Sequence, residues 1–185
     1  MIVTVNGKDF EIVKNANLTG ANLTGVDFTK SYLTGVNFTD ADLTDAIFGN
    51  VDLNNVKFLN ANLTNANFAR SDLSRSDFRY ANLTNANLSH CDLSNSSFCL
   101  ADLTDADLHN SDLSYTDLAN VNLTGANLIG VNLTGSNLSF ANLTNAKLIN
   151  SNLAKVNWFS ANLTNVNMFC ARNYREFSWE EFYNV

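Results

Sequence analysis

Large apolar residues recur at every fifth position through most of the 185-residue chain. From Leu18 to Met168, 31 successive positions five residues apart are each occupied by Leu, Phe, Trp or Met. Two residues before each of these centres stands a small side chain, which is Ala 14 times, Val 8 times, Ser 7 times, and otherwise Cys91 or Thr116. The residue directly before the centre is Asn in 16 repeats and Asp in 10. The repeating unit is therefore [Ala/Ser/Val]-[Asn/Asp]-[Leu/Phe]-x-x.

A period of five fits neither a helix nor a flat strand. On an α-helix each residue turns about 100°, so centres five residues apart would rotate by roughly 140° per step and share no face. In a strand, successive side chains point to opposite faces, so an odd spacing would separate successive centres. A turn in every repeat removes the conflict, because the chain then wraps around an axis with each centre pointing inward. The pattern predicts an all-β solenoid.

The repeat resembles that of the pentapeptide repeat family, whose pattern A[D/N]LXX recurs at 61–65 (ANLTN), 101–105 (ADLTD) and 161–165 (ANLTN). The resemblance covers residues 16–170 and implies a right-handed quadrilateral β-helix with four repeats, or 20 residues, per coil. With neighbouring strands about 4.8 Å apart, this length gives about eight coils and a rod of ~37 Å.

Sorting the centres at intervals of 20 residues supports the four-sided coil. The columns that begin at Leu23 and at Leu33 contain only Leu. The Phe centres fall in the other two columns, on opposite walls, at Phe28, Phe38, Phe48, Phe58, Phe68, Phe78 and Phe98. Bulky and less bulky walls that alternate in this way can fill a narrow interior to normal packing density. The glycines at the last repeat position are expected in turns that need a positive φ.

Two flanking segments are predicted to cap the coil, whose ends would otherwise expose unpaired strand edges. Residues 1–15 are expected to form a hairpin, because Asn6-Gly7 suits a type I′ turn. Residues 171–185 are expected to form a C-terminal cap with a short helix, because Ser178 and Glu181 make a capping box. Aromatic residues there either cover the last coil or join two copies in a homodimer, which the family resemblance also suggests. These candidates are Tyr174, Phe177, Trp179, Phe182 and Tyr183.

Asparagine and aspartate before the centres have different expected roles. Stacked Asn side chains are expected to bridge neighbouring strands by amide hydrogen bonds. In the column from Leu33 four carboxylates fall in line, and like charges on neighbouring strands are unfavourable. They are either relieved by backbone N–H groups and counter-ions or form a binding stripe. Between residues 80 and 146 the chain has six acidic residues and neither Lys nor Arg. The candidate interaction surface is Asp52, Asp72, Asp92, Asp102, Asp107, Asp112 and Asp117.

Catalytic, metal and membrane functions find little support in the sequence. No nucleophile–base pair or phosphate-binding loop stands out, so we expect no enzyme and no cofactor. His90 and His109 are about one coil apart without a third ligand, which predicts no metal site, and three Cys residues make no disulfide framework. The chain lacks an apolar run of membrane-spanning length and a secretory signal at its start, which favours a cytoplasmic protein without membrane contact.

Two hypotheses about function remain. The first is a non-catalytic structural or protein-interaction scaffold with an unidentified protein partner, of the kind abundant in cyanobacteria. The second is a DNA mimic that binds a type II topoisomerase such as DNA gyrase. The resemblance to the pentapeptide repeat family suggests this, because some of its members act in this way in quinolone resistance. Duplex DNA carries one charge per ~1.7 Å, whereas the repeat region has 13 acidic and 7 basic residues, a net charge of −6. We favour the first hypothesis, and neither involves direct binding of nucleic acid.

Overall fold

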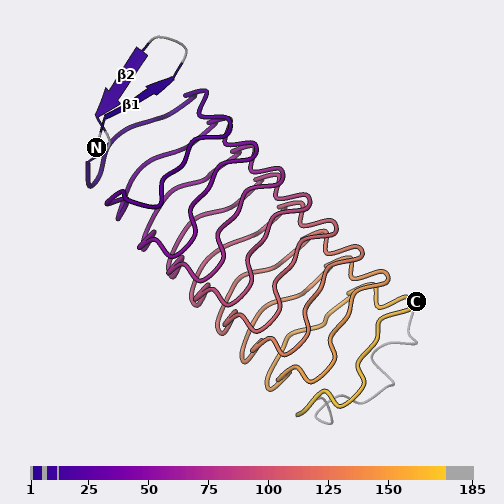
Figure 1. Ribbon diagram of the computed structural model, residues 1–185. Coiled ribbons are helices and arrows are strands. Elements are labelled where there is room, and N and C mark those ends of the chain that lie inside the picture. Colours follow the sequence, from indigo (N-terminus) through magenta and orange to yellow (C-terminus); the bar gives the residue numbers. More distant parts are fainter. Residues whose placement is uncertain (1, 6–7, 12, 174–185) are drawn as a thin grey trace.

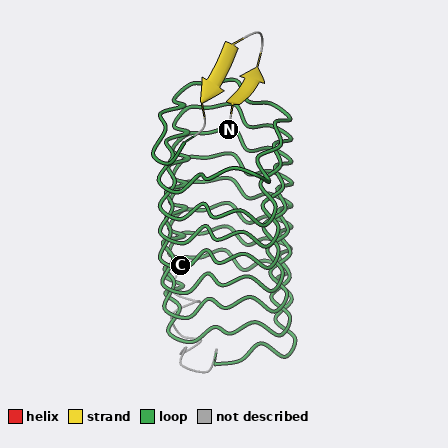
Figure 2. Ribbon diagram, turned by 60° about the vertical axis from the view of Figure 1, so that its left-hand side comes forward, coloured by secondary structure: helices red, strands yellow, loops and turns green. Residues whose placement is uncertain are grey.

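The computed structural model describes residues 2–5, 8–11 and 13–173. Two short strands, β1 (Ile2–Val5) and β2 (Lys8–Glu11), pair antiparallel with Ile2 opposite Glu11 at the N-terminal end of the molecule (Figure 1). The rest of the described chain winds as one continuous coil along the long axis, without a projecting loop (Figure 2). Asn6-Gly7, on which the predicted hairpin turn depends, and the predicted C-terminal helix lie outside the described residues.

Successive coils pair in parallel with a register of 20 residues. Each bridge joins the residue before a centre to its counterpart one coil later, as in Asn62↔Asn82. Three backbone hydrogen bonds hold most steps: the N–H of Leu43 donates to the carbonyl of Asn62 at 2.7 Å, that of Asp45 to Thr64 at 3.0 Å, and that of Asn62 to Ala41 at 2.9 Å. Four repeats therefore complete one coil, which is the four-sided β-helix that the family resemblance implies.

A β-turn closes each repeat. In most repeats the carbonyl of the centre accepts a hydrogen bond from the N–H three residues later, as from Ala66 to Leu63 at 3.0 Å. The third residue of the turn has a positive φ in every described repeat except at Lys30, between 55° at Ser160 and 71° at Gly35. Gly adopts this conformation without strain and Asn with little, which explains why both recur at the last repeat position. The turn role predicted for the glycines is confirmed.

The centres and the small residues two positions earlier fill the interior. Rings from one wall stack along the axis, with 4.7 Å between the centroids of Phe28 and Phe48, and meet the opposite wall edge-on, with 5.8 Å between Phe28 and Phe38. All seven core Phe side chains are fully buried. Inward polar groups are satisfied, since the Ser71 hydroxyl donates to the carbonyl of Phe48 at 2.7 Å. Cys91 fills an inward small-residue slot, and burial raises the pKa of its thiol to about 11.

The four faces are numbered in chain order by their first centre. Face 1 begins at Leu18, face 2 at Leu23, face 3 at Phe28 and face 4 at Leu33, and each later centre of a face lies 20 residues further on. The last two residues of each repeat form the edges between faces, which we call edge 1–2, edge 2–3, edge 3–4 and edge 4–1.

Candidate interaction surface

Face 4 carries an acidic column that runs along the rod. Bridges join Asp52 to Asp72, Asp72 to Asp92, and Asp92 to Asp112, so the four carboxylates stand one coil apart in line. The first three side chains are exposed and Asp112 is half-buried. Each carboxylate accepts a hydrogen bond from the backbone N–H two residues later, at 2.9–3.0 Å. This local bond fixes each side chain at its own turn but does not link one coil to the next.

Amide donors from neighbouring coils are scarce along this column. Asn132 Nδ2 donates to Asp112 at 3.0 Å, and the Thr34 hydroxyl donates to Asp52 at 3.1 Å. Within the described residues, neither Asp72 nor Asp92 receives a side-chain donor from an adjacent coil. We call Asp52, Asp72, Asp92 and Asp112 the acidic column. Its middle carboxylates face each other across a coil spacing of about 4.8 Å with no amide between them.

Face 2 shows what the same position does when it is occupied mainly by Asn. Asn62 Oδ1 accepts from the Thr64 hydroxyl at 2.7 Å, while Asn62 Nδ2 donates to Thr44 in the preceding coil at 2.8 Å and to Asp42 at 3.3 Å. The pattern recurs at Asn122, Asn142 and Asn162. The predicted amide ladder is therefore confirmed, and Thr closes it at every turn of edge 2–3. The Thr44 hydroxyl is also the main cause of the lowered pKa of Asp42.

The other three predicted acidic residues are separated from the column and from one another. Asp102 lies on face 2, Asp107 on face 3 and Asp117 on face 1, all in the coil that contains Asp112. Each accepts an amide hydrogen bond from an Asn one coil later, at 3.1, 2.9 and 3.1 Å respectively. The structure therefore brings four of the seven candidates together and distributes the other three around the rod as part of a ring.

Basic side chains border the acidic column without neutralising it. Arg70 and Arg75 lie in the turns on either side of Asp72, both are exposed, and neither makes an ion pair within the described part of the chain. On face 1, by contrast, Arg79 Nη2 approaches Asp77 Oδ2 at 2.7 Å. Partial burial favours a raised pKa for Asp77, but the hydrogen bonds and charge of Arg79 outweigh it and lower that pKa.

The two histidines do meet, on edge 3–4. Their ring centroids are 4.8 Å apart in an edge-on arrangement, and Asp107 Oδ1 lies 2.8 Å from Nδ1 of His109. Within the described residues, no group of three or more His, Cys, Asp or Glu side chains could hold a metal ion.

Edge 1–2 carries a feature that the repeat pattern did not reveal. Large exposed apolar side chains follow one another there at Tyr80, Leu100, Phe140 and Phe159. Large residues in the last two repeat positions, read at intervals of 20, are the sequence signal that would have found this row. The predicted aromatic contacts of the C-terminus, Tyr174, Phe177, Trp179, Phe182 and Tyr183, lie outside the described residues.

The sequence model of the family described as pentapeptide repeats matches the chain in eight copies, over residues 14–50, 41–79, 58–95, 81–118, 101–139 and 141–168. The chain belongs to the pentapeptide repeat family. Among curated proteins no sequence matches this pentapeptide repeat protein significantly. In the described residues, no helix is long and apolar enough to cross a membrane.

Solved structures of other pentapeptide repeat proteins are similar to this one. HetL, involved in heterocyst differentiation regulation in the cyanobacterium Nostoc sp. strain PCC 7120, is 27% identical, with 84% of each chain covered and a TM-score of 0.41. QnrB1, a plasmid-mediated fluoroquinolone resistance protein, is 17% identical over 94% of this chain and 99% of its own, with a TM-score of 0.41. The protein alr5209 from Nostoc PCC 7120 is 35% identical over 49% of this chain and 69% of its own, with a TM-score of 0.36. At these TM-scores the similarities carry no inference about function.

Proposed function

We propose that this pentapeptide repeat protein is a non-catalytic scaffold that binds a partner protein through the acidic column of face 4. The proposal rests on a difference between faces in how far their outward polar groups are hydrogen-bonded within the rod. Face 2 uses its amide and hydroxyl groups in bonds within the rod, whereas Asp72 and Asp92 keep exposed carboxylates without an inter-coil donor. A partner that supplies cations relieves the repulsion within the column, so binding and relief of repulsion are coupled.

The partner surface implied by this column is narrow and basic. Four carboxylates at a coil spacing of about 4.8 Å extend over roughly 14 Å, which matches a short row of Lys or Arg side chains. Arg70 and Arg75 on the bordering edges would repel a broad basic surface, so the partner's cations must fit between them. The four-sided coil holds the carboxylates in register, which reduces the ordering cost of binding.

Photo-crosslinking from face 4 tests this function. Tyr115 borders the acidic column on edge 4–1 and already holds an aromatic ring, so p-benzoyl-phenylalanine can replace it with little disturbance. In an extract of the native host we expect one discrete crosslinked protein from this position and none from a crosslinker at Asn85 on edge 2–3. Asp52/Asp72/Asp92→Asn should abolish that product, because the column loses its charge.

The matched control is Asp102/Asp107/Asp117→Asn, which removes the same charge from the ring and leaves the column intact. Its crosslinked product should persist. A product that survives loss of the column, or disappears equally in the control, contradicts the proposal.

Mimicry of DNA toward a type II topoisomerase is the second candidate, favoured by the straight alignment of the column on one face. The charge density is against it. One carboxylate per ~4.8 Å along face 4 is about a third of the one charge per ~1.7 Å of duplex DNA. The six acids between residues 80 and 146 do not raise this value, because Asp102, Asp107 and Asp117 lie on the other three faces and Asp105 lies on edge 2–3.

A supercoiling assay with purified DNA gyrase, with and without a quinolone, separates the two candidates. Inhibition or drug protection that is lost in Asp52/Asp72/Asp92→Asn, but kept in the ring control, would establish the mimic. Absence of any effect at micromolar protein would leave the scaffold as the function to pursue with the crosslinking experiment.

A further inference from the structure

Bulky side chains occupy strained turn positions on edge 1–2. Tyr80, Leu100 and Phe140 have φ values of 61°, 62° and 59°, in the left-handed region that disfavours large side chains. Gly or Asn would hold the same turn with less strain, and Asn60 and Asn120 do so elsewhere on this edge. Large apolar residues at such positions point to a role outside the fold itself.

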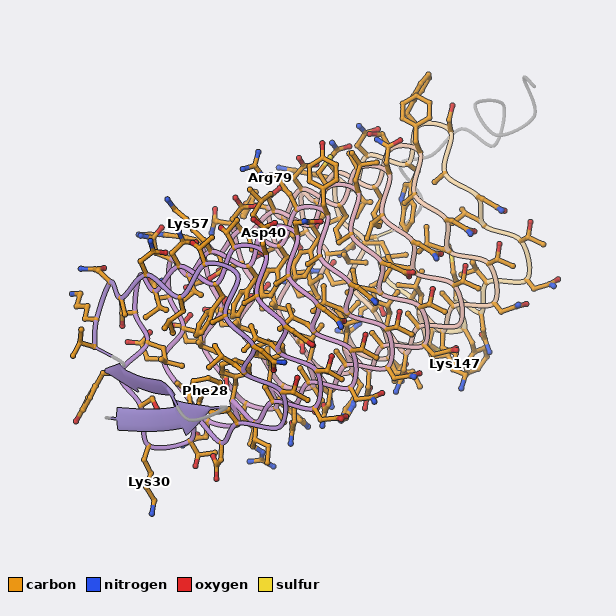
Figure 3. The ribbon with its side chains drawn as sticks, turned by 90° about the horizontal axis from the view of Figure 1, so that it is seen from above. Phe28, Lys30, Asp40, Lys57, Arg79 and Lys147 are labelled. Carbon is orange, nitrogen blue, oxygen red and sulfur yellow. The ribbon has the colours of Figure 1, made fainter. Side chains whose placement is uncertain are left out.

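The row is long and open to solvent. Tyr80 is 57% exposed, Leu100 47%, Phe140 55% and Phe159 66%, and we call these four residues the apolar edge. The rings of Phe140 and Phe159 meet edge-on, with centroids 5.4 Å apart. Arg79, next to Tyr80, marks this edge on the upper side of the rod in Figure 3. Exposed large apolar side chains gathered along one edge are typical of a contact with another protein surface.

The apolar edge is nearly symmetric about its middle coil. Two coils carry Tyr80 and Leu100, the next carries the small pair Ala119 and Asn120, and the following two carry Phe140 and Phe159. When such a row meets an antiparallel copy of itself, large side chains lie opposite large ones and the small pair lies at the centre. This is the self-complementarity that an isologous two-fold contact requires.

Charge selects the antiparallel arrangement over the parallel one. Asp102 flanks the first half of the apolar edge, together with Asp77 in its ion pair with Arg79, whereas residues 118–146 contain no charged side chain. Asp117 lies beside Ala119 in the middle coil. Parallel copies would place the acidic half of one rod beside the acidic half of the other. Antiparallel copies place the acidic half of one rod opposite the Asn ladders of the other, at Asn137, Asn142, Asn157 and Asn162.

We propose that the apolar edge is the contact between two copies of this chain lying side by side and antiparallel, with the two-fold axis near Ala119 and Asn120. The contact is small. At about 100 Å² of buried surface per exposed large side chain, eight side chains bury ~800 Å², below the roughly 1,600 Å² of a standard stable interface. The dimer is therefore weak and should form only at high protein concentration.

Sedimentation equilibrium over a wide concentration range tests the contact. Wild-type protein should shift from monomer to dimer as its concentration rises into the high micromolar range. Leu100→Asn/Phe140→Asn should weaken association at least tenfold and raise the melting temperature measured at low concentration, because Asn tolerates the positive φ of both turns. The second readout shows that the variant is folded, so loss of association cannot be attributed to unfolding.

Tyr115→Asn is the matched control. Tyr115 is equally exposed, at 65%, and has a φ of 57°, but it lies on edge 4–1. Its replacement should leave association unchanged. Wild-type protein that stays monomeric throughout, or a Leu100→Asn/Phe140→Asn variant that associates as tightly as wild type, overturns the proposal. The latter result is the one expected if association instead proceeds through the ends of the rod.

Disulfide trapping tests the orientation. In a background with Cys99→Ser and Cys170→Ser, an Asn120→Cys thiol lies near the two-fold axis and should form a homodimeric disulfide on mild oxidation. An Asn60→Cys thiol on the same edge, three coils away, should not, because antiparallel packing separates the two copies of residue 60. Equal trapping at both positions would indicate parallel packing and contradict the proposal.

Discussion

Faces 2 and 4 lie on opposite sides of the rod and share the same interior but not the same exterior. Both present only Leu at the centre position of the fully described repeats, and both pair their coils through bridges with a register of 20 residues. Outside, face 2 carries mainly Asn, whose amides bond to Thr in the preceding coil, with acidic residues at Asp42 and Asp102. Face 4 has Asp at four successive levels of the same position.

The difference arises from the hydrogen-bonding groups that each side chain carries. Asn has both a donor and an acceptor, so its Oδ1 binds its own turn while its Nδ2 reaches the preceding coil. Ionised Asp is acceptor-only and can complete just the first of these bonds. The coil requires inward apolar residues and turns that accept a positive φ. The residue directly before each centre can either bond to a neighbouring coil or stay available to a partner, without a change of fold.

The largest expected effect concerns the interiors of faces 2 and 4, which should contribute equally to stability. Leu63→Ala on face 2 and Leu73→Ala on face 4 each remove a fully buried side chain. Each should lower the free energy of unfolding by about 2–5 kcal/mol, through lost burial and the cavity left behind. Urea unfolding followed by circular dichroism measures both losses. A difference of more than about 2 kcal/mol between the two losses would show that the interiors of faces 2 and 4 are not equivalent.

Opposite substitutions on the two exteriors should change stability in opposite directions. Asn62→Asp deletes the donor to Thr44 and sets a carboxylate beside Asp42, so it should cost about 1–2 kcal/mol. Asp72→Asn supplies a donor toward Asp52 and removes a charge from the column, so it should gain about 0.5–1 kcal/mol. The same urea experiment measures both. If both substitutions changed the free energy of unfolding in the same direction, the acidic column would already be neutralised.

The salt dependence of stability tests whether charge repulsion distinguishes face 4 from the other faces. Removing charge with Asp52/Asp72/Asp92→Asn should stabilise the rod by about 1 kcal/mol at low ionic strength, and this gain should shrink near 1 M NaCl, where the screening length falls to ~3 Å. Asp102/Asp107/Asp117→Asn removes charge from side chains that already accept Asn amides and keeps an acceptor oxygen at each position, so it should show no such gain. Thermal melts at several salt concentrations distinguish the two variants.

The smallest expected effect concerns Asp77. Arg79 donates hydrogen bonds to its carboxylate, as Asn amides donate to their acceptors on face 2. Burial opposes ionisation, but Arg79 lowers the pKa of Asp77 below its ordinary value. The pair therefore contributes stability above the unfolded-state pKa of about 3.9, and that contribution is lost as pH falls through the lower folded-state pKa. Because the pair is partly exposed, Arg79→Gln should destabilise the rod only slightly at pH 7. The difference from wild type should vanish in melts at strongly acidic pH.

Much of the fold is set by the one-dimensional pattern. The spacing of five excludes helix and flat strand, and the all-Leu columns at Leu23 and Leu33 anticipate the four walls that the bridges display. The positive φ values at Gly20 and Gly25 agree with the turn role expected for the glycines. The alignment of Asp52 with Asp72 is also determined once the 20-residue coil is known.

Other features depended on contacts between coils. The acidic residues from 92 to 117 are clustered in the sequence but divided in space between the acidic column and a ring around the rod. Which carboxylate is satisfied depends on the residue 20 positions later, as Asn127 shows for Asp107. The apolar edge likewise joins residues from separate coils.

Sequence by itself therefore determined the coil, its interior and its turns, because these depend on a repeat of five residues that each segment carries locally. Tertiary structure decided which outward side chains bind one another and which are left available. The physical reason is that a solenoid brings residues about 20 positions apart into hydrogen-bonding distance. Because Asn donates to the preceding coil, an Asp that has Asn 20 residues later, such as Asp112, accepts an amide hydrogen bond. An Asp that has another Asp 20 residues later, such as Asp92, accepts only the bond from its own turn.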